Sequence, residues 1–125
     1  MVCRVMMLCP VEEVCLDPGR MAALAAEFGA AGAESLVQRA KGEMALLMSS
    51  LVAYSAEAAY AAFARGLRSL RRLAEHVGMP GLARAAQAVA DCVARGDSTA
   101  LAATWARLLR LAERGLAGSW GQRAV

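Results

Sequence analysis

The sequence predicts an all-α protein, an up-and-down antiparallel four-helix bundle with a short extra helix at its N-terminal end. Three observations favour this fold. Alanine, the strongest helix former, is abundant. Aromatic residues make up only 5% of the chain. Apolar side chains also recur at three- and four-residue steps in several segments, as they do along the buried face of a helix. The short connections expected between the helices favour antiparallel neighbours.

The N-terminal part of the chain contains one clear helix start. Residues 1–16 show no regular period, so they are expected to be loose or to form a short helix on the bundle. Asp17-Pro18 then combines a capping carboxylate with a proline at the first helical position. We therefore predict a short helix from Pro18 to about Phe28, with Met21, Leu24 and Phe28 facing inward. Gly29-Ala30-Ala31-Gly32 is expected to end it.

A longer helix is predicted from about Ala33 to Ala53. Its apolar residues form a wide stripe at helical spacing, which is typical of a face packed in a core. They are Leu36, Val37, Ala40, Met44, Leu47, Met48 and Leu51. We expect a turn at Tyr54-Ser55, with the Ser55 side chain capping the next helix.

The central helix is predicted from Ala56 to Val77, and it has two distinct faces. The inward stripe consists of Tyr60, Phe63, Leu67, Leu70, Ala74 and Val77. The water-facing side consists of Arg65, Arg68, Arg72 and Glu75, with Arg71 nearer the boundary. Gly78 suits the left-handed position just past a helix end, and Pro80 suits the first turn of the next helix. These two residues predict a tight turn.

Two further helices complete the predicted bundle. One runs from Pro80 to Arg95, and the last begins after Gly96-Asp97-Ser98 and fades between Gly115 and Gly118. The predicted division is therefore an N-terminal segment at residues 1–16, a helical bundle at 17–118 and a tail at 119–125. No internal repeat or linker interrupts this pattern.

Charge and apolar patterning limit the classes of function. Residues 61–125 carry ten basic and four acidic side chains, which predicts a basic surface suited to an acidic partner. Nucleic acid is an unlikely partner, because aromatic side chains do not alternate with the arginines. Uncharged stretches are too short to span a bilayer, and residues 1–10 are too short for a signal peptide. We expect a cytoplasmic protein that has no membrane partner.

The sequence offers little catalytic or metal-binding chemistry. Cys3, Cys9, Cys15 and Cys92 form no CxxC pair, and they fit free thiols in a reducing compartment. The one histidine, His76, is not enough to assemble a metal site or a nucleophilic triad. We therefore predict no metal site, no cofactor and no independent enzyme active site.

The predicted hairpin around Gly78 resembles the histidine phosphotransfer (Hpt) domains of bacterial phosphorelays. These four-helix bundles carry H-x-x-K-G-(S/A) on one helix, with a glycine ten residues after the histidine. The segment Val77-Gly78-Met79-Pro80-Gly81-Leu82-Ala83 looks like the end of that motif, and Gly96-Asp97 resembles the G-D between the last two helices. The likeness is specific over about residues 66–97, and it implies a signalling protein of two-component systems.

The phosphotransfer positions of this resemblance carry arginines. Counting back from Gly78 places Arg68 at the phospho-accepting position, Arg71 at the lysine position and Arg72 at the glycine position. A guanidinium stays protonated and cannot accept a phosphoryl group as a neutral imidazole does. Arg72 would also crowd the approach of an aspartyl phosphate. The resemblance thus implies an Hpt-like bundle that lacks phosphotransfer chemistry at the motif position.

The functional prediction is a docking surface for a response-regulator receiver domain or a histidine kinase. Its residues are Arg65, Arg68, Arg71, Arg72, Glu75 and Arg84, and arginines of this kind pair with carboxylates or phosphates. Three alternatives remain. His76, near the end of its helix, could be a displaced phosphorylation site as well as a surface or capping residue. The chain could be a helical oligomerisation module. Nucleic-acid binding would show strong salt dependence.

Overall fold

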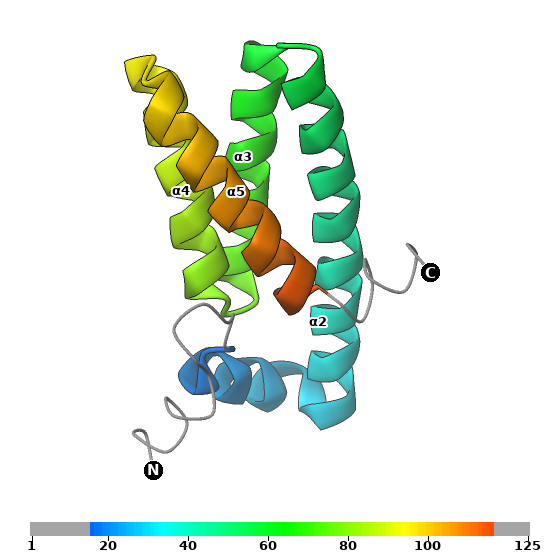
Figure 1. The fold of residues 1–125 in the computed structure, drawn as a ribbon. Helices are drawn as coiled ribbons and strands as arrows, with labels where there is room; N and C mark the ends of the chain where they lie inside the picture. The colour runs from blue at the N-terminus through cyan, green and yellow to red at the C-terminus, as the bar shows by residue number, and fades with distance from the viewer. Residues whose placement is uncertain (1–15, 117–125) are drawn as a thin grey trace.

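The computed structural model describes residues 16–116, which form four α-helices (Figure 1). They are α2 (Pro18–Ala56), α3 (Tyr60–His76), α4 (Pro80–Arg95) and α5 (Ser98–Gly115). Within these residues there is no strand, so the all-α prediction is confirmed for this part of the chain. The tail predicted at 119–125 and most of the N-terminal segment lie outside the described residues.

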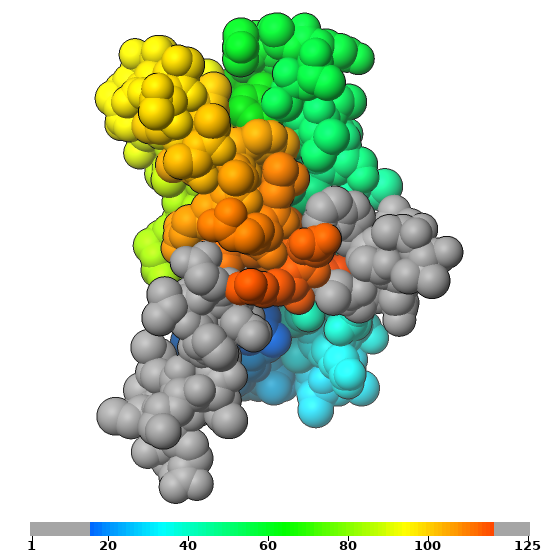
Figure 2. Space-filling view, in the orientation of Figure 1, coloured from blue at the N-terminus to red at the C-terminus, as the bar shows by residue number. Residues whose placement is uncertain are grey.

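Helices that follow one another in the sequence pack side by side. α2 contacts α3, α3 contacts α4 and α4 contacts α5, while α5 also touches α2. α5 crosses the bundle obliquely, and the space-filling view shows it lying over the space between α4 and α2 (Figures 1 and 2). One face of α3 is therefore covered by the core, whereas its opposite face is left to solvent.

The two helices expected before residue 54 are one kinked helix. α2 begins where Asp17-Pro18 predicted, and the Asp17 Oδ1 atom accepts a hydrogen bond from the Gly19 N–H at 3.0 Å. The break is confined to Gly29, whose φ of 80° and ψ of 164° suit glycine, and helical geometry resumes immediately afterwards. Residues 17–28, which are the N-cap and the part of α2 before the kink, are here called the α2 arm, and they run across the lower end of the bundle (Figure 1).

The connection between α2 and α3 corrects the sequence prediction. α2 continues through Tyr54-Ser55 to Ala56, and Ser55 caps no helix because α3 starts at Tyr60. The reversal is closed by backbone alone, with the Ala59 N–H donating to the Tyr54 carbonyl at 2.9 Å. Ala58 adopts a left-handed φ of 56°. The segment contains neither glycine nor proline, so nothing in its composition marked the end of the helix.

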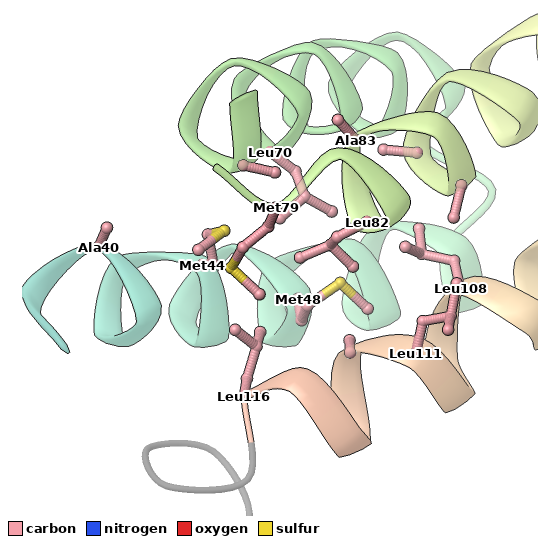
Figure 3. Packing of buried hydrophobic residues seen from close by; sticks show 14 of the residues in the cluster. Ala40, Met44, Met48, Leu70, Met79, Leu82, Ala83, Leu108, Leu111 and Leu116 are labelled. Atoms are coloured by element: carbon pink, nitrogen blue, oxygen red, sulfur yellow. The ribbon is translucent and has the colours of Figure 1, made fainter. Parts of the chain in front are cut away.

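The core is built mainly from aliphatic and methionine side chains together with Phe63, and the described residues contain no buried polar or charged side chain. Figure 3 shows Met44 and Met48 of α2 beside Met79 and Leu82, with Leu108, Leu111 and Leu116 closing the other side. Phe63 meets Trp105 edge-on at a centroid distance of 5.1 Å. Most of the inward residues predicted for the central helix are buried as expected, namely Phe63, Leu67, Leu70 and Ala74 of α3 and Val77 just after it.

Two aromatic residues are exposed where burial was predicted. Phe28 is 52% exposed and Tyr60 is 55% exposed. Phe28 immediately precedes the kink at Gly29, so the stripe to which it belongs leaves the core there. Tyr60 is the first residue of α3, and the buried face of that helix begins about one turn later, at Phe63. In both cases the helical period is right, but the buried stripe stops about one turn short of the aromatic residue. No helix within residues 16–116 is both long enough and apolar enough for a membrane span.

A basic groove between α3 and α4 as candidate docking site

The outer face of α3 carries the charged residues that the sequence placed there. Arg65, Arg68, Arg72 and Glu75 are exposed, and Arg71 is half-buried. This arrangement follows from the periodicity of α3, because the residues that face the core leave the opposite side of the helix in water. The exposure of four of these residues and the boundary position of Arg71 therefore agree with the prediction.

A shallow groove, here called the α3–α4 groove, runs between these two helices. One part of it has a volume of ≈ 320 Å³ and the other ≈ 250 Å³. Arg71 and Gln87 line both parts, so the two hollows adjoin each other along the α3–α4 contact. The charged or polar residues along the whole groove are Arg68, Arg71, Glu75, Arg84, Gln87 and Asp91.

Alanines make the floor of this groove shallow and apolar. Ala83 and Ala86 are buried beneath it, and Ala90 and Ala94 line its upper part. Methyl side chains leave room for a partner side chain or backbone to approach α4 closely. The groove can thus combine apolar contact at its floor with charged contact at its edges.

The electrostatics of the groove leave two guanidinium groups available. Arg71 donates to both oxygens of Glu75 at 3.1 Å, and Gln87 donates to Asp91 Oδ1 at 2.9 Å. Both carboxylates are therefore engaged within their own helix. Among residues 16–116, Arg68 and Arg84 have no hydrogen-bond or ion-pair partner. A free, exposed guanidinium in a groove is suited to bidentate binding of a carboxylate or phosphate.

The predicted patch is divided between two faces of α3, and only one of them adjoins α4. Arg65 and Arg72 line neither part of the groove. They are seven residues apart, close to two full turns, and so share one face of the helix. Arg72 directly follows Arg71, so this face lies about 100° round the helix from Arg71. The groove instead includes Gln87 and Asp91, which the sequence analysis did not single out. The signal was present, because residues 84, 87 and 91 recur at helical spacing on the exposed side of α4.

His76 lies outside the groove, at the last position of α3. The Arg20 Nε–H donates to the His76 carbonyl at 2.6 Å, and the Arg20 Nη2 atom is 3.4 Å from His76 Nδ1. Because a guanidinium only donates, Nδ1 is the acceptor in that contact. The imidazole is exposed, as the sequence indicated, and its neighbour is the α2 arm.

The α2 arm also holds the turn that follows α3, residues 77–79. The Asp17 N–H donates to the Gly78 carbonyl at 2.6 Å. Gly78 has the left-handed φ of 77° that the sequence predicted. A Cβ there would also lie 2.8 Å from Arg20 Cβ, so a second requirement for glycine comes from tertiary packing. The sequence around Gly78 does not predict that contact, because Arg20 lies far from it in the chain.

Neither a search for metal ligands nor a comparison with known proteins assigns a function to this chain. Within the part of the chain that the structure describes, no three His, Cys, Asp or Glu side chains gather as a metal site would require. No protein-family model, no curated protein and no solved structure matches this chain. The Hpt resemblance therefore stays a prediction, and the arguments for function come from the α3–α4 groove itself.

Proposed function

We propose that the chain is a protein-docking module of the Hpt type, an up-and-down bundle that works in the cytoplasm and binds an acidic partner in its α3–α4 groove. The observation that supports it most is the pair of unpartnered guanidinium groups, Arg68 and Arg84, on opposite sides of an alanine floor. Carboxylates or phosphates of a partner would pair with them, while apolar partner atoms would cover the alanines.

The partner class follows from the resemblance around Gly78. A receiver domain presents an acidic, phosphorylated pocket, which is complementary in charge to the groove. Arg68 stands at the position where Hpt domains carry the phospho-accepting histidine, and it cannot take up a phosphoryl group. The proposed mechanism is therefore occupancy: the groove covers the receiver pocket and changes which other proteins can dock there. A histidine kinase that carries a receiver domain would be bound in the same way.

The test is a binding titration of the purified chain against a panel of purified receiver domains, by calorimetry. Arg68→Glu is expected to weaken binding at least about ten-fold, equivalent to ~1.4 kcal/mol. Arg39→Glu is the matched control, because Arg39 is exposed on α2 and its reversal changes net charge equally. Circular dichroism should show both variants helical, since each replaces an exposed residue by a good helix former.

A third variant separates the groove from the wider arginine face. Arg65 and Arg72 lie outside the groove, so their joint reversal to glutamate should weaken binding less than Arg68→Glu does. Equal weakening by Arg68→Glu and Arg39→Glu would contradict a specific site and indicate general charge attraction. Absence of binding to any receiver domain would contradict the proposed partner class.

A further inference from the structure

A second, apolar cleft lies in the angle of the kinked helix α2 and shares no lining residue with the α3–α4 groove. The cleft has a volume of ≈ 360 Å³. Met21 and Ala25 of the α2 arm line one wall, and Ala33 and Val37 line the other. Its rim carries Glu34, Gln38 and Lys41. Because the walls belong to two parts of one helix that diverge at Gly29, helix packing alone leaves this angle open (Figure 1).

The chain enters this cleft from its N-terminal end. Leu16 is itself one of the lining residues. The next residue, Asp17, is fixed by the hydrogen bond from its N–H to the Gly78 carbonyl at 2.6 Å. The point from which residues 1–15 depart is thus held at the cleft.

The composition of residues 1–15 matches the walls of the cleft. Eleven of these fifteen residues are Val, Met, Leu or Cys. Burial of such side chains is favourable, and their exposure is costly in water. The segment carries charges of both signs, at Arg4, Glu12 and Glu13, and so does the rim, at Glu34 and Lys41. The apolar character of the segment is therefore complementary to the walls, and ion pairs with the rim can form in either direction.

The length of the segment is also sufficient. The far wall of the cleft extends from Ala30 to Lys41, which is about 17 Å along a helix. Fifteen residues reach about 22 Å as a helix and about 50 Å when extended. The other segment outside the described residues, 117–125, contains Trp120 and Val125 as its large apolar residues and does not begin at the cleft.

We propose that residues 1–15 fold back into this cleft and cover it, with Cys9 and Cys15 among the protected side chains. The segment then completes the core at the kinked end of the bundle and fixes the α2 arm against the rest of α2. The cleft is an intramolecular docking site, and its lining residues are different from those of the α3–α4 groove.

Thiol reactivity in the full chain tests the proposal. The folded protein is treated with an alkylating reagent, and each cysteine is followed by mass spectrometry, with buried Cys92 as the internal standard for protection. Cys9 and Cys15 should react at least about ten-fold more slowly than in the urea-unfolded chain, because local opening must precede reaction. Ala25→Glu, inside the cleft, should remove this protection, whereas Ala26→Glu, exposed beside it, should preserve it.

Cross-linking gives a second measurement. Gln38→Cys places a thiol on the rim, and Ser50→Cys places one further along the same helix, away from the cleft. Under oxidised glutathione, Gln38→Cys should form an intramolecular disulfide with Cys9 or Cys15, and Ser50→Cys should not. The proposal is overturned if Cys9 and Cys15 react as fast as in urea, if the two variants cross-link equally, or if Gln38→Cys gives only disulfides between two chains.

Discussion

Replacing Gly78 by alanine should destabilise the fold more than the same change at Gly96. Both glycines follow a helix and have a left-handed φ, 77° at Gly78 and 70° at Gly96. An alanine therefore pays a similar conformational cost at each, about 1–2 kcal/mol. The surroundings differ, because a Cβ at Gly96 meets nothing within 4 Å, whereas one at Gly78 would lie 2.8 Å from Arg20 Cβ.

The additional cost at Gly78 comes from the α2 arm. The obstructing atom is a Cβ, so it can move away only if the backbone of the arm moves. Two hydrogen bonds then weaken, from the Asp17 N–H to the Gly78 carbonyl and from the Arg20 Nε–H to the His76 carbonyl. Each has a net value of about 0.5–1.5 kcal/mol. Gly78→Ala should therefore lower the free energy of unfolding by at least about 1 kcal/mol more than Gly96→Ala.

Urea unfolding followed by far-ultraviolet circular dichroism measures the difference directly. In thermal unfolding, the excess destabilisation corresponds to a midpoint about 4–8 °C lower for a domain of this size. Equal losses for the two variants would refute the reasoning, because they would show that the arm does not press on the turn. A loss at Gly96 larger than at Gly78 would refute it as well.

Three further predictions concern backbone strain, helix packing and phosphorylation. Gly42→Ala should stabilise the protein by about 0.8–1 kcal/mol through helix propensity, since a Cβ added there meets nothing within 4 Å. Gly66→Ala should lose that gain, because the added Cβ would lie 2.8 Å from the buried Leu51 Cδ2. The midpoints of urea unfolding of the two variants compare the two effects. Ala58→Gly should raise the unfolding free energy by up to about 1 kcal/mol, since it relieves a φ of 56°; a fall would contradict the strain. Incubation with a phosphorylated receiver domain should leave the wild type and His76→Gln equally free of acid-labile phosphate, and label on the wild type alone would favour phosphotransfer at His76.

The order of the helices and most of the core follow from local rules. The start of α2 at Asp17-Pro18 and the left-handed Gly78 were predictable because their chemistry depends on adjacent residues. The exposed arginines of α3 were predictable because helical periodicity alone decides which face is buried. These features need no knowledge of the partner helices.

The remaining features depend on residues far apart in the sequence. Whether Gly29 ends a helix or only bends it depends on how the arm packs, and the sequence contains no rule for that choice. At the turn after α2, Ala58 rather than a glycine adopts the left-handed conformation, and the fold tolerates the strain. The composition of the segment therefore did not indicate a turn. The division of the arginine face arises because α4 covers one flank of α3, which brings Arg84 and Gln87 beside Arg71.

Two hydrogen bonds, from Asp17 to the Gly78 carbonyl and from Arg20 to the His76 carbonyl, couple the α2 arm to the connection between α3 and α4. The turn leads directly into Pro80, which lines the α3–α4 groove. A ligand that stiffens the groove should therefore slow hydrogen exchange at the Asp17 amide, whose acceptor is the Gly78 carbonyl. By reciprocity, any event that lifts the arm should weaken the affinity of the groove by the same factor.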